Sequence, residues 1–243
     1  NGSRDAVEEA LERGVEWAVE EGYATESDLA HCEDEGRRPD ARPEFVSKKA
    51  KDRGMNQMGS LGSGNHFLEV QRVTDTFDDE TAEAFGLEAD QIVVLIHCGS
   101  RGLGHQVCSD YVRKIEQEHG DLLERLPDKD LAAAPAGSEL AEEYYGAMCA
   151  AVNFAWVNRQ LITHCTREVF SDVFDAPVEE LGLELLYDVA HNIAKRETHD
   201  VDGDDRDLFV HRKGATRAFP AGREEVPDAY RDVGQPIIIP GSM

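Results

Sequence analysis

Residues 139–170 read ELAEEYYGAMCAAVNFAWVNRQLITHCTREVF, a stretch with no proline and no internal loop signal. Its apolar residues recur mostly at steps of three and four, the spacing of one face of an α-helix. The pattern therefore predicts one long helix with a broad apolar face. The residues on this face are Tyr144, Ala147, Ala151, Phe154, Val157 and Leu161.

Shorter patterns on both sides of this helix predict further elements. Residues 4–22 alternate apolar residues with glutamates at helical steps, which predicts an amphipathic helix that ends at Gly22. Apolar or alternating runs predict strands over residues 67–71, 91–97, 183–191, 208–213 and 235–240. The run 91–97 is continuously apolar as in a buried strand, and we expect a glycine-bearing loop, CGSRGLG, directly after it. Because helices and strands are interleaved, we expect an α/β (α+β) fold, with one domain as the default for this length.

The charge of the chain is strongly acidic. It has 50 Asp and Glu against 25 Lys and Arg, a formal net charge of −25, and the acids are spread along the sequence. A dispersed acidic coat is typical of a halophilic protein, where the Debye length is about 3 Å at 1 M salt. An acidic mesophilic protein is the alternative. Such a chain repels a phosphate backbone unless its cations are gathered in one place.

Cysteine usage and hydropathy bear on the compartment. The five cysteines form no CxxC pair and are odd in number, which favours neither a zinc ribbon nor a disulfide scaffold. No apolar stretch reaches the length of a membrane span, and the acidic start at Asn1 does not resemble a signal peptide. We expect a cytoplasmic protein without a membrane partner.

Three histidines lie beside glycine- or asparagine-bearing turns, in the strings GSLGSGNHF, VVLIHCGSRGLGH and LLYDVAHN. His66 falls at the start of a predicted strand, His97 at the end of another, and His191 follows an apolar run. Neutral imidazoles in such positions are common ligands of transition metals. The alternative is that each is an ordinary core or surface histidine, since long spacing alone is a weak metal signal.

A few cations are candidates for an oxyanion pocket. Arg212, Lys213 and Arg217 form a basic cluster, and Arg53 and Arg101 lie in glycine-bearing segments where side chains and backbone amides would both meet a phosphate. The alternative is that each arginine pairs with one of the many carboxylates. The string GSRGLG lacks the dinucleotide fingerprint, and no P-loop ending is present.

Six segments of the chain, in order, resemble the signature segments of the RtcB RNA ligases. They are GSLGSGNHFLEVQ, HCGSRGLGHQV, AVNFAWVNRQ, DVAHNIAK, HRKGATRAFP and QPIIIPGSM. The likeness covers nearly the whole chain from about residue 4. It implies an RtcB-like fold, with mixed central β-sheets flanked by helices.

The resemblance also implies an activity. Members of this family join an RNA 2',3'-cyclic phosphate or 3'-phosphate end to a 5'-hydroxyl end, as in tRNA splicing and RNA repair, with GTP and two manganese ions. A histidine is guanylylated by GTP, GMP passes to the RNA 3'-phosphate, and the 5'-hydroxyl displaces it. The expected partners are RNA ends such as tRNA halves, and GTP; whether a protein activator takes part is open.

Residue by residue, the resemblance implies three roles. His66, His97 and His191 match the family's metal-binding histidines, and Arg53, Arg101 and Lys213 match cations that hold the RNA phosphate or the transferring phosphoryl group. Residues around the bound guanine nucleotide are matched by Asn65, Phe67, Glu69, Asn192, Pro240, Gly241 and Ser242.

Two family segments do not occur in this sequence. One is an Asp-x-Gly-Cys segment with two metal ligands, expected before Asn1, and the other is a His-Gly-Ala-Gly-Arg segment with the guanylylated histidine, expected after Met243. We therefore interpret residues 1–243 as a catalytic-domain fragment that is inactive alone. Two other classes stay open: a module that binds guanine nucleotide or RNA ends without chemistry, and a metal-dependent phosphoesterase.

Overall fold

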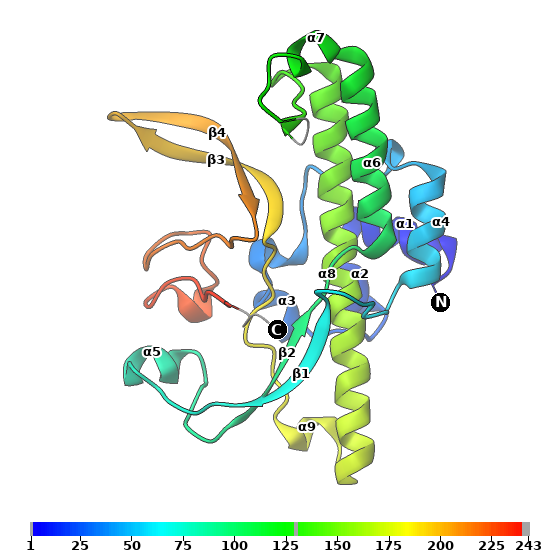
Figure 1. The fold of residues 1–243 in the computed structure, drawn as a ribbon. Coiled ribbons are helices and arrows are strands. Elements are labelled where there is room, and N and C mark those ends of the chain that lie inside the picture. Colours follow the sequence, from blue (N-terminus) through cyan, green and yellow to red (C-terminus); the bar gives the residue numbers. More distant parts are fainter. Residues whose placement is uncertain (1, 129–130, 240–243) are drawn as a thin grey trace. The chain divides into compact units, whose positions relative to one another are not determined.

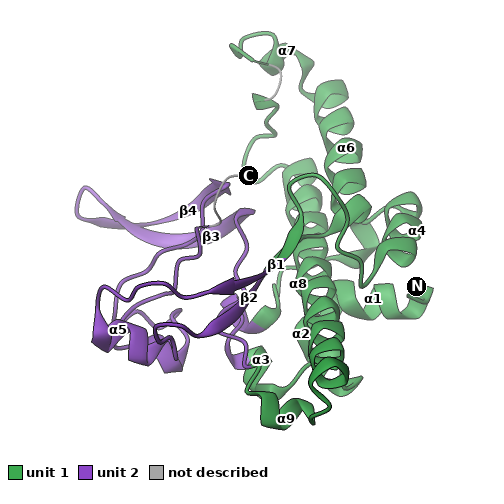
Figure 2. Cartoon of the chain, turned by 60° about the horizontal axis from the view of Figure 1, so that its bottom comes forward, with its two compact units in different colours: residues 1–29, 36–68, 96–183 green, residues 30–35, 69–95, 184–243 purple. Residues whose placement is uncertain are grey.

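The computed structural model describes residues 2–128 and 131–239. Within these residues, helices and two small β-sheets are interleaved, so the predicted α/β (α+β) class is confirmed. The chain divides into two compact units, coloured separately in Figure 2. Unit 1 consists of residues 1–29, 36–68 and 96–183, and unit 2 consists of residues 30–35, 69–95 and 184–243.

The longest element is helix α8, Glu139–Phe174, which confirms the predicted long helix and ends a turn later than expected (Figure 1). It begins where the Ser138 hydroxyl accepts a hydrogen bond from the backbone N–H of Ala141. It ends at Asp175, which adopts a left-handed conformation with φ of 50°. Many residues along α8 are buried, so its apolar side forms the centre of the core of unit 1.

Four helices that precede α8 in sequence build much of the rest of unit 1. α8 packs against α1 (Arg4–Arg13), α2 (Val15–Glu20) and α6 (Arg101–Glu118), while α4 (Lys48–Gln57) packs against α6 and α1. The prediction of a single helix over residues 4–22 was wrong, because Gly14 separates α1 from α2. Gly14 has φ of +59°, and a Cβ there would lie 2.2 Å from the Gly36 carbonyl oxygen. This close tertiary contact breaks the helix.

The other helical elements are short. They are α3 (Glu26–Ala30), α5 (Asp79–Ala84), α7 (Gly120–Leu123), α9 (Val178–Leu181) and the 3₁₀ turns Glu33–Gly36, Pro43–Phe45 and Asp228–Tyr230. None of the described helices is long and apolar enough to span a lipid bilayer.

The first sheet pairs β1 (Phe67–Arg72) with β2 (Ile92–His97), so both predicted strands are confirmed. The boundary between the two units falls inside both strands. β2 is half-buried rather than buried, and Ile92 is 55% exposed. Within the described residues this sheet has two strands, so each has one neighbour and the other edge of β2 is not covered by a strand.

The second sheet is an antiparallel hairpin of β3 (Asn192–Val201) and β4 (Asp204–Lys213), which lies in unit 2. Its turn is formed by Asp202 and Gly203, whose φ angles of 57° and 89° are those of a two-residue hairpin. The predicted strand 208–213 is therefore confirmed as part of β4. Two other strand predictions were wrong, since residues 183–191 form only an isolated bridge, Cys32 to Asp188, and residues 235–239 form no strand.

Unit 2 has a small apolar cluster of its own. Its buried members are Tyr187, Val226 and Tyr230, and partly buried side chains such as Phe85 and Phe219 pack on them. The ring of Phe85 meets that of Tyr230 edge-on, with centroids 5.2 Å apart. These aromatic contacts pack irregular segments of unit 2 against one another.

Candidate functional site

In unit 1, the start of β1 and the end of β2 bring two of the three predicted histidines together. The rings of His66 and His97 have centroids 6.0 Å apart. Phe67 meets the His97 ring edge-on at 5.3 Å, which fixes that imidazole in place. The sequence placed His66 at the start of one strand and His97 at the end of another, and both positions are confirmed.

Arg101 lies directly beside these imidazoles. Its Nη1 is 2.7 Å from Nδ1 of His66, and since a guanidinium only donates, Nδ1 accepts this hydrogen bond. The prediction of a loop over CGSRGLG was wrong from Arg101 onward, because helix α6 begins at this residue. The φ angle of Arg101 is +53°. The guanidinium lies against Gly62, where a Cβ would come within 2.0 Å of its carbon. The glycine-rich segment before His66 therefore makes room for the arginine.

Burial and charge keep both imidazoles neutral. Desolvation lowers the pKa of His66, and the neighbouring Arg101 and His97 lower it further. Desolvation also lowers the pKa of His97, with a smaller contribution from the cationic Arg159. Neutral imidazole is the form that binds metal ions. The adjacent thiol of Cys98 is held in its neutral form as well, since burial raises its pKa.

Asn158 of α8 holds the two histidine-bearing segments in place. This fully buried amide accepts hydrogen bonds from the backbone N–H groups of Gly59 and Ser60, at 2.8 and 3.2 Å. Its Nδ2 donates to the carbonyl oxygens of Ser60 and Gly99, at 3.2 and 3.1 Å. One side chain therefore joins the segment before His66 to the segment after His97. The sequence reading missed this role, although Asn158 lies in one of the family-like strings, AVNFAWVNRQ.

Arg53 does not lie in a flexible segment as expected, because residues 48–57 form helix α4. It is exposed, and its Nη1 donates to Oε1 of Gln106 on α6 at 3.2 Å. One turn further along α4, Oε1 of Gln57 accepts a hydrogen bond of 2.7 Å from the backbone N–H of Gly102. These contacts place Arg53 beside the first turns of α6, the helix that begins with Arg101.

Two of the residues predicted to contact the guanine nucleotide, Asn65 and Glu69, lie just before and within β1. Asn65 is exposed next to His66, and Glu69, in the part of β1 that belongs to unit 2, accepts a hydrogen bond of 2.9 Å from Gln71. Pro240, Gly241 and Ser242 lie outside the described residues.

The base of the hairpin in unit 2 brings together three predicted site residues. His191 precedes β3, and Asn192 is paired in register with Lys213. The backbone N–H of Gly214 donates to the His191 carbonyl at 2.7 Å and to Oδ1 of Asn192 at 3.1 Å. The glycine after Lys213 thus ties together the two ends of the hairpin.

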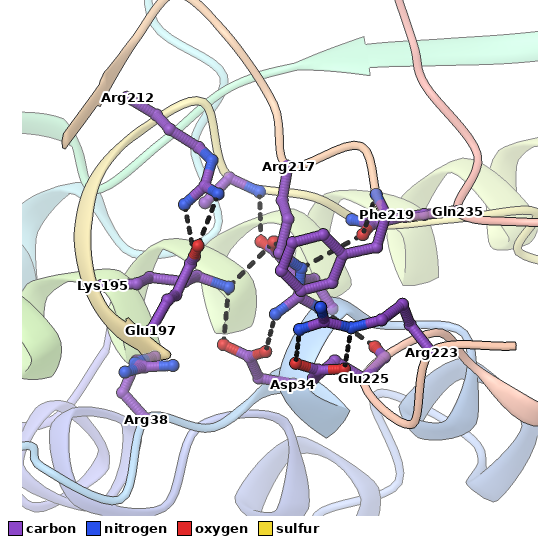
Figure 3. Close-up of polar contacts among 12 residues, drawn as sticks. Asp34, Arg38, Lys195, Glu197, Arg212, Arg217, Phe219, Arg223, Glu225 and Gln235 are labelled. Carbon is purple, nitrogen blue, oxygen red and sulfur yellow. Dashed lines mark hydrogen bonds and ion pairs between the residues drawn. The ribbon is translucent and has the colours of Figure 1, made fainter. Parts of the chain in front are cut away.

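Two members of the predicted basic cluster are occupied by ion pairs, so for them the oxyanion-pocket prediction was wrong. Arg212 binds Glu197 through both guanidinium nitrogens. Figure 3 shows the buried Arg217 and Lys195 converging on Asp34, with Nη1 and Nζ at 3.0 and 2.7 Å from its carboxylate. These arginines instead hold unit 2 together.

No group of three or more His, Cys, Asp or Glu side chains is arranged to hold a metal ion in residues 2–128 and 131–239. Unit 1 by itself supplies two imidazoles and the guanidinium of Arg101. His191 belongs to unit 2. The arrangement in unit 1 is suited to neutral nitrogen donation to a cation beside a fixed anion-binding group.

Comparison with known proteins gives a consistent match along the whole sequence. The family model described as tRNA-splicing ligase RtcB matches residues 1–243. Similar proteins with that name include one from Archaeoglobus fulgidus, 55% identical over 98% of this chain and 49% of its own length. Others are from Methanococcus maripaludis, 53% identical over 99% of this chain and 50% of the relative, and Methanocaldococcus jannaschii, 54% identical over 99% and 25%. The chain thus spans about half, or less, of the length of these relatives.

Proposed function

The chain belongs to the tRNA-splicing ligase RtcB family, and on this premise we propose that it forms part of an enzyme that ligates RNA. The observation that carries the proposal is the meeting of His66, His97 and Arg101 at the ends of β1, β2 and α6. The proposed reaction joins an RNA 3'-phosphate or 2',3'-cyclic phosphate end to a 5'-hydroxyl end and depends on GTP and manganese. The substrates are RNA ends such as tRNA halves.

The chemistry of unit 1 fits a manganese site. His66 and His97 have lowered pKa values and so are neutral, the form that binds metal ions. On His66 a metal ion would replace either the Arg101 hydrogen bond at Nδ1 or the proton at Nε2. His191 is proposed as a third donor. A bound metal ion would neutralise charge on phosphoryl oxygens, which is a large part of catalysis in phosphoryl transfer. Two such ions are expected in the whole enzyme.

The protein's own groups position the phosphate. A phosphate bound by Arg101 would lie beside the His66 imidazole, because the guanidinium is 2.7 Å from Nδ1. Arg53 and Lys213, both exposed, are proposed to contact the RNA or transferring phosphate. The guanine nucleotide is proposed to contact Asn65, Phe67, Glu69 and Asn192, together with Pro240, Gly241 and Ser242.

We further propose that both units belong to one catalytic domain and that this chain provides only a share of the active centre. An Asp-x-Gly-Cys segment with two metal ligands and a His-Gly-Ala-Gly-Arg segment with the guanylylated histidine do not occur in residues 1–243. The share provided here is the imidazole ligands and most of the nucleotide pocket. The chain alone should therefore bind manganese without becoming guanylylated.

Manganese binding can be measured by the loss of the electron paramagnetic resonance signal of the free ion as the chain is added. His97→Ala should weaken the affinity at least about tenfold, since it removes a ligand. His105→Ala is the matched control, because His105 is exposed on α6 and no ligand role is proposed for it. Equal affinity of the two variants would contradict the proposed site.

Labelled GTP separates the remaining functions. Incubation of the chain with GTP and manganese should leave no covalent GMP after denaturation, and retained label would show that the nucleophile lies in residues 1–243. Cleavage of a cyclic phosphate end by the chain, if lost in His97→Ala, would favour a phosphoesterase instead. Tight GTP binding that manganese does not alter would favour a binding module.

A further inference from the structure

Helices α4 and α6 lie side by side in unit 1 (Figure 1). Side chains of α6, of α4 and of the segment just before α4 line a groove. The groove has a volume of about 320 Å³, and its polar lining comes from Ser47, Lys49, Asp110, Tyr111, Arg113, Lys114 and Gln117. The helices approach closely because a Cβ at Gly54 of α4 would lie only 2.6 Å from Leu103 of α6. We call this feature the α4–α6 groove.

The α4–α6 groove is cationic in a chain that otherwise avoids positive charge. The charged side chains that line it are three cations, Lys49, Arg113 and Lys114, and one carboxylate, Asp110, whereas the whole chain has 50 acidic and 25 basic residues. Lys49 and Arg113 are exposed, and neither forms an ion pair within the described ranges. Cations that are not used to neutralise a carboxylate remain available for an external anion.

The other charged groups of the groove are already engaged. The carboxylate of Asp110 accepts hydrogen bonds of 2.7 Å from the Ser47 hydroxyl and from the Gln106 amide. Lys114 lies 4.5 Å from the centre of the Tyr111 ring and pairs at 3.2 Å with a glutamate of α8. The two cations that project without such partners are therefore Lys49 and Arg113.

Beyond one end of the groove, helices α4 and α6 lead to the candidate site. α4 and α6 run antiparallel, since Ser47 contacts Asp110 while Gln57 contacts Gly102. Arg53 is one turn beyond Lys49 on α4, about 5–6 Å away between Cβ atoms. From Arg113 back to Arg101, α6 rises about 18 Å. At about 3.4 Å per nucleotide along a helical strand, this length accommodates roughly five nucleotides.

From this row of cations we propose that the α4–α6 groove binds the phosphate backbone of RNA as it leads away from the reacting end, with Lys49 and Arg113 as the contact residues. The choice of RNA rests on the proposed function, whereas the location of the site rests on the groove itself. Because the rest of the chain is acidic, an RNA strand is repelled elsewhere and is held where unpaired cations are concentrated.

The test is fluorescence anisotropy of a labelled single-stranded RNA titrated with the chain, from about 0.05 to about 0.5 M KCl. Removing both cations, in Lys49→Gln/Arg113→Gln, should weaken binding by up to about fivefold for each cation at moderate salt. The slope of log affinity against log salt should become shallower by about 1.4, because two contacts with a single strand are lost. Unrelated RNA sequences should be affected equally, since a backbone contact does not read bases.

Lys51→Gln is the matched control on the same helix. Lys51 is paired with Glu8 at 2.8 Å and its side chain is 11% exposed, so this change should leave RNA affinity and the salt slope unaltered. Lys49→Arg/Arg113→Lys should bind like the unaltered chain, because both charges are kept. Circular dichroism melting curves of all variants check that the fold is intact.

Three results would overturn the inference. The first is that the unaltered chain and the double variant bind RNA with the same affinity and the same salt slope. This result would not affect the ligase proposal. The second is no measurable RNA binding by the unaltered chain even at low salt. This result would not decide the proposed function, which is tested separately by manganese binding and its dependence on His97. The third is equally tight binding of polyglutamate with the same loss in the double variant, which would assign the groove to an acidic protein partner.

Discussion

At the scale of single residues, the candidate site depends on a side chain that performs no chemistry. Asn158 uses both ends of its amide to satisfy four backbone groups of the two segments that carry the histidines. A buried backbone group that loses its partner costs about 1–3 kcal/mol. Asn158 is therefore a positioning residue, and its removal should affect stability and metal affinity together.

Asn158→Ala should lower the free energy of unfolding by about 3 kcal/mol and weaken manganese binding, because His66 and His97 are then held less firmly. Urea unfolding measures the first effect and manganese titration the second. Asn56→Ala is the control, since Asn56 is exposed on α4 and should cost less than about 0.5 kcal/mol. Equal losses in both variants would refute the positioning role.

The sequence predicted one part of the site and not the other, for a physical reason. His66, His97 and Arg101 stood out because polar residues at strand ends and near glycines are visible in a local pattern. Asn158 did not, since its partners are 59 to 99 residues away in sequence and nothing in the helical pattern marks an amide that faces inward. Arg217 was misread because its partner Asp34 is 183 residues away.

At the scale of elements, short helices are joined to α8 by buried polar contacts. Thr25 and Asp28 cap the start of α3 reciprocally, each side chain accepting a hydrogen bond from the other's backbone N–H. The buried carboxylate of Asp28 also binds Arg167 of α8 through two hydrogen bonds of 2.7 Å. Burial works to raise the pKa of Asp28, but the bonds from Arg167 and Thr25 outweigh it, so the pKa is lowered below 3.8.

Asp28→Asn should lower the free energy of unfolding by about 3 kcal/mol at neutral pH, since it leaves the buried guanidinium without its charge partner. A carboxylate with a lowered folded-state pKa stabilises the protein above its unfolded pKa, and this contribution is lost as the pH falls through the folded pKa. The difference between the two proteins should therefore stay constant from about pH 7 to about pH 5 and shrink below about pH 4.

Urea unfolding at a series of pH values measures this difference. Asp52→Asn serves as the control, because Asp52 is about half exposed and its contact with Arg4 is 3.7 Å. It should cost less than about 1 kcal/mol at any pH. If the loss of unfolding free energy in Asp28→Asn grows as the pH falls, the result would contradict a lowered pKa of Asp28 in the folded protein.

Elements with a strong internal pattern were predicted, and those that depend on distant partners were not. The period of α8 and the apolar runs of β1, β2 and β4 are properties of the segments themselves. Residues 183–191 and 235–239 are just as apolar as strands, but they lie in irregular segments, and among the residues that the structure describes their one bridge joins Asp188 to Cys32. The break at Gly14 arises from contact with Gly36, which no local pattern contains.

At the scale of the whole molecule, the excess of acidic residues governs how the chain responds to salt. A net charge of −25 destabilises a compact state through self-repulsion, and added salt screens it. The melting temperature should therefore rise by at least about 5 °C between about 0.1 and about 2 M KCl. Sorbitol at equal osmolality is the control that carries no ions. A melting temperature that is flat or falls with KCl would contradict the expected salt adaptation.

The ion pairs of Asp34 also bear on how the protein is made. Its partner lysine at position 195 follows 161 residues later, and the arginine at position 217 follows 183 residues later. At about 5–20 residues per second, the ribosome leaves this carboxylate without either cation for roughly 8–30 s. During that interval the nascent chain exposes an anionic segment that cannot yet be buried, so unit 2 completes its fold only as synthesis of residues 1–243 nears its end.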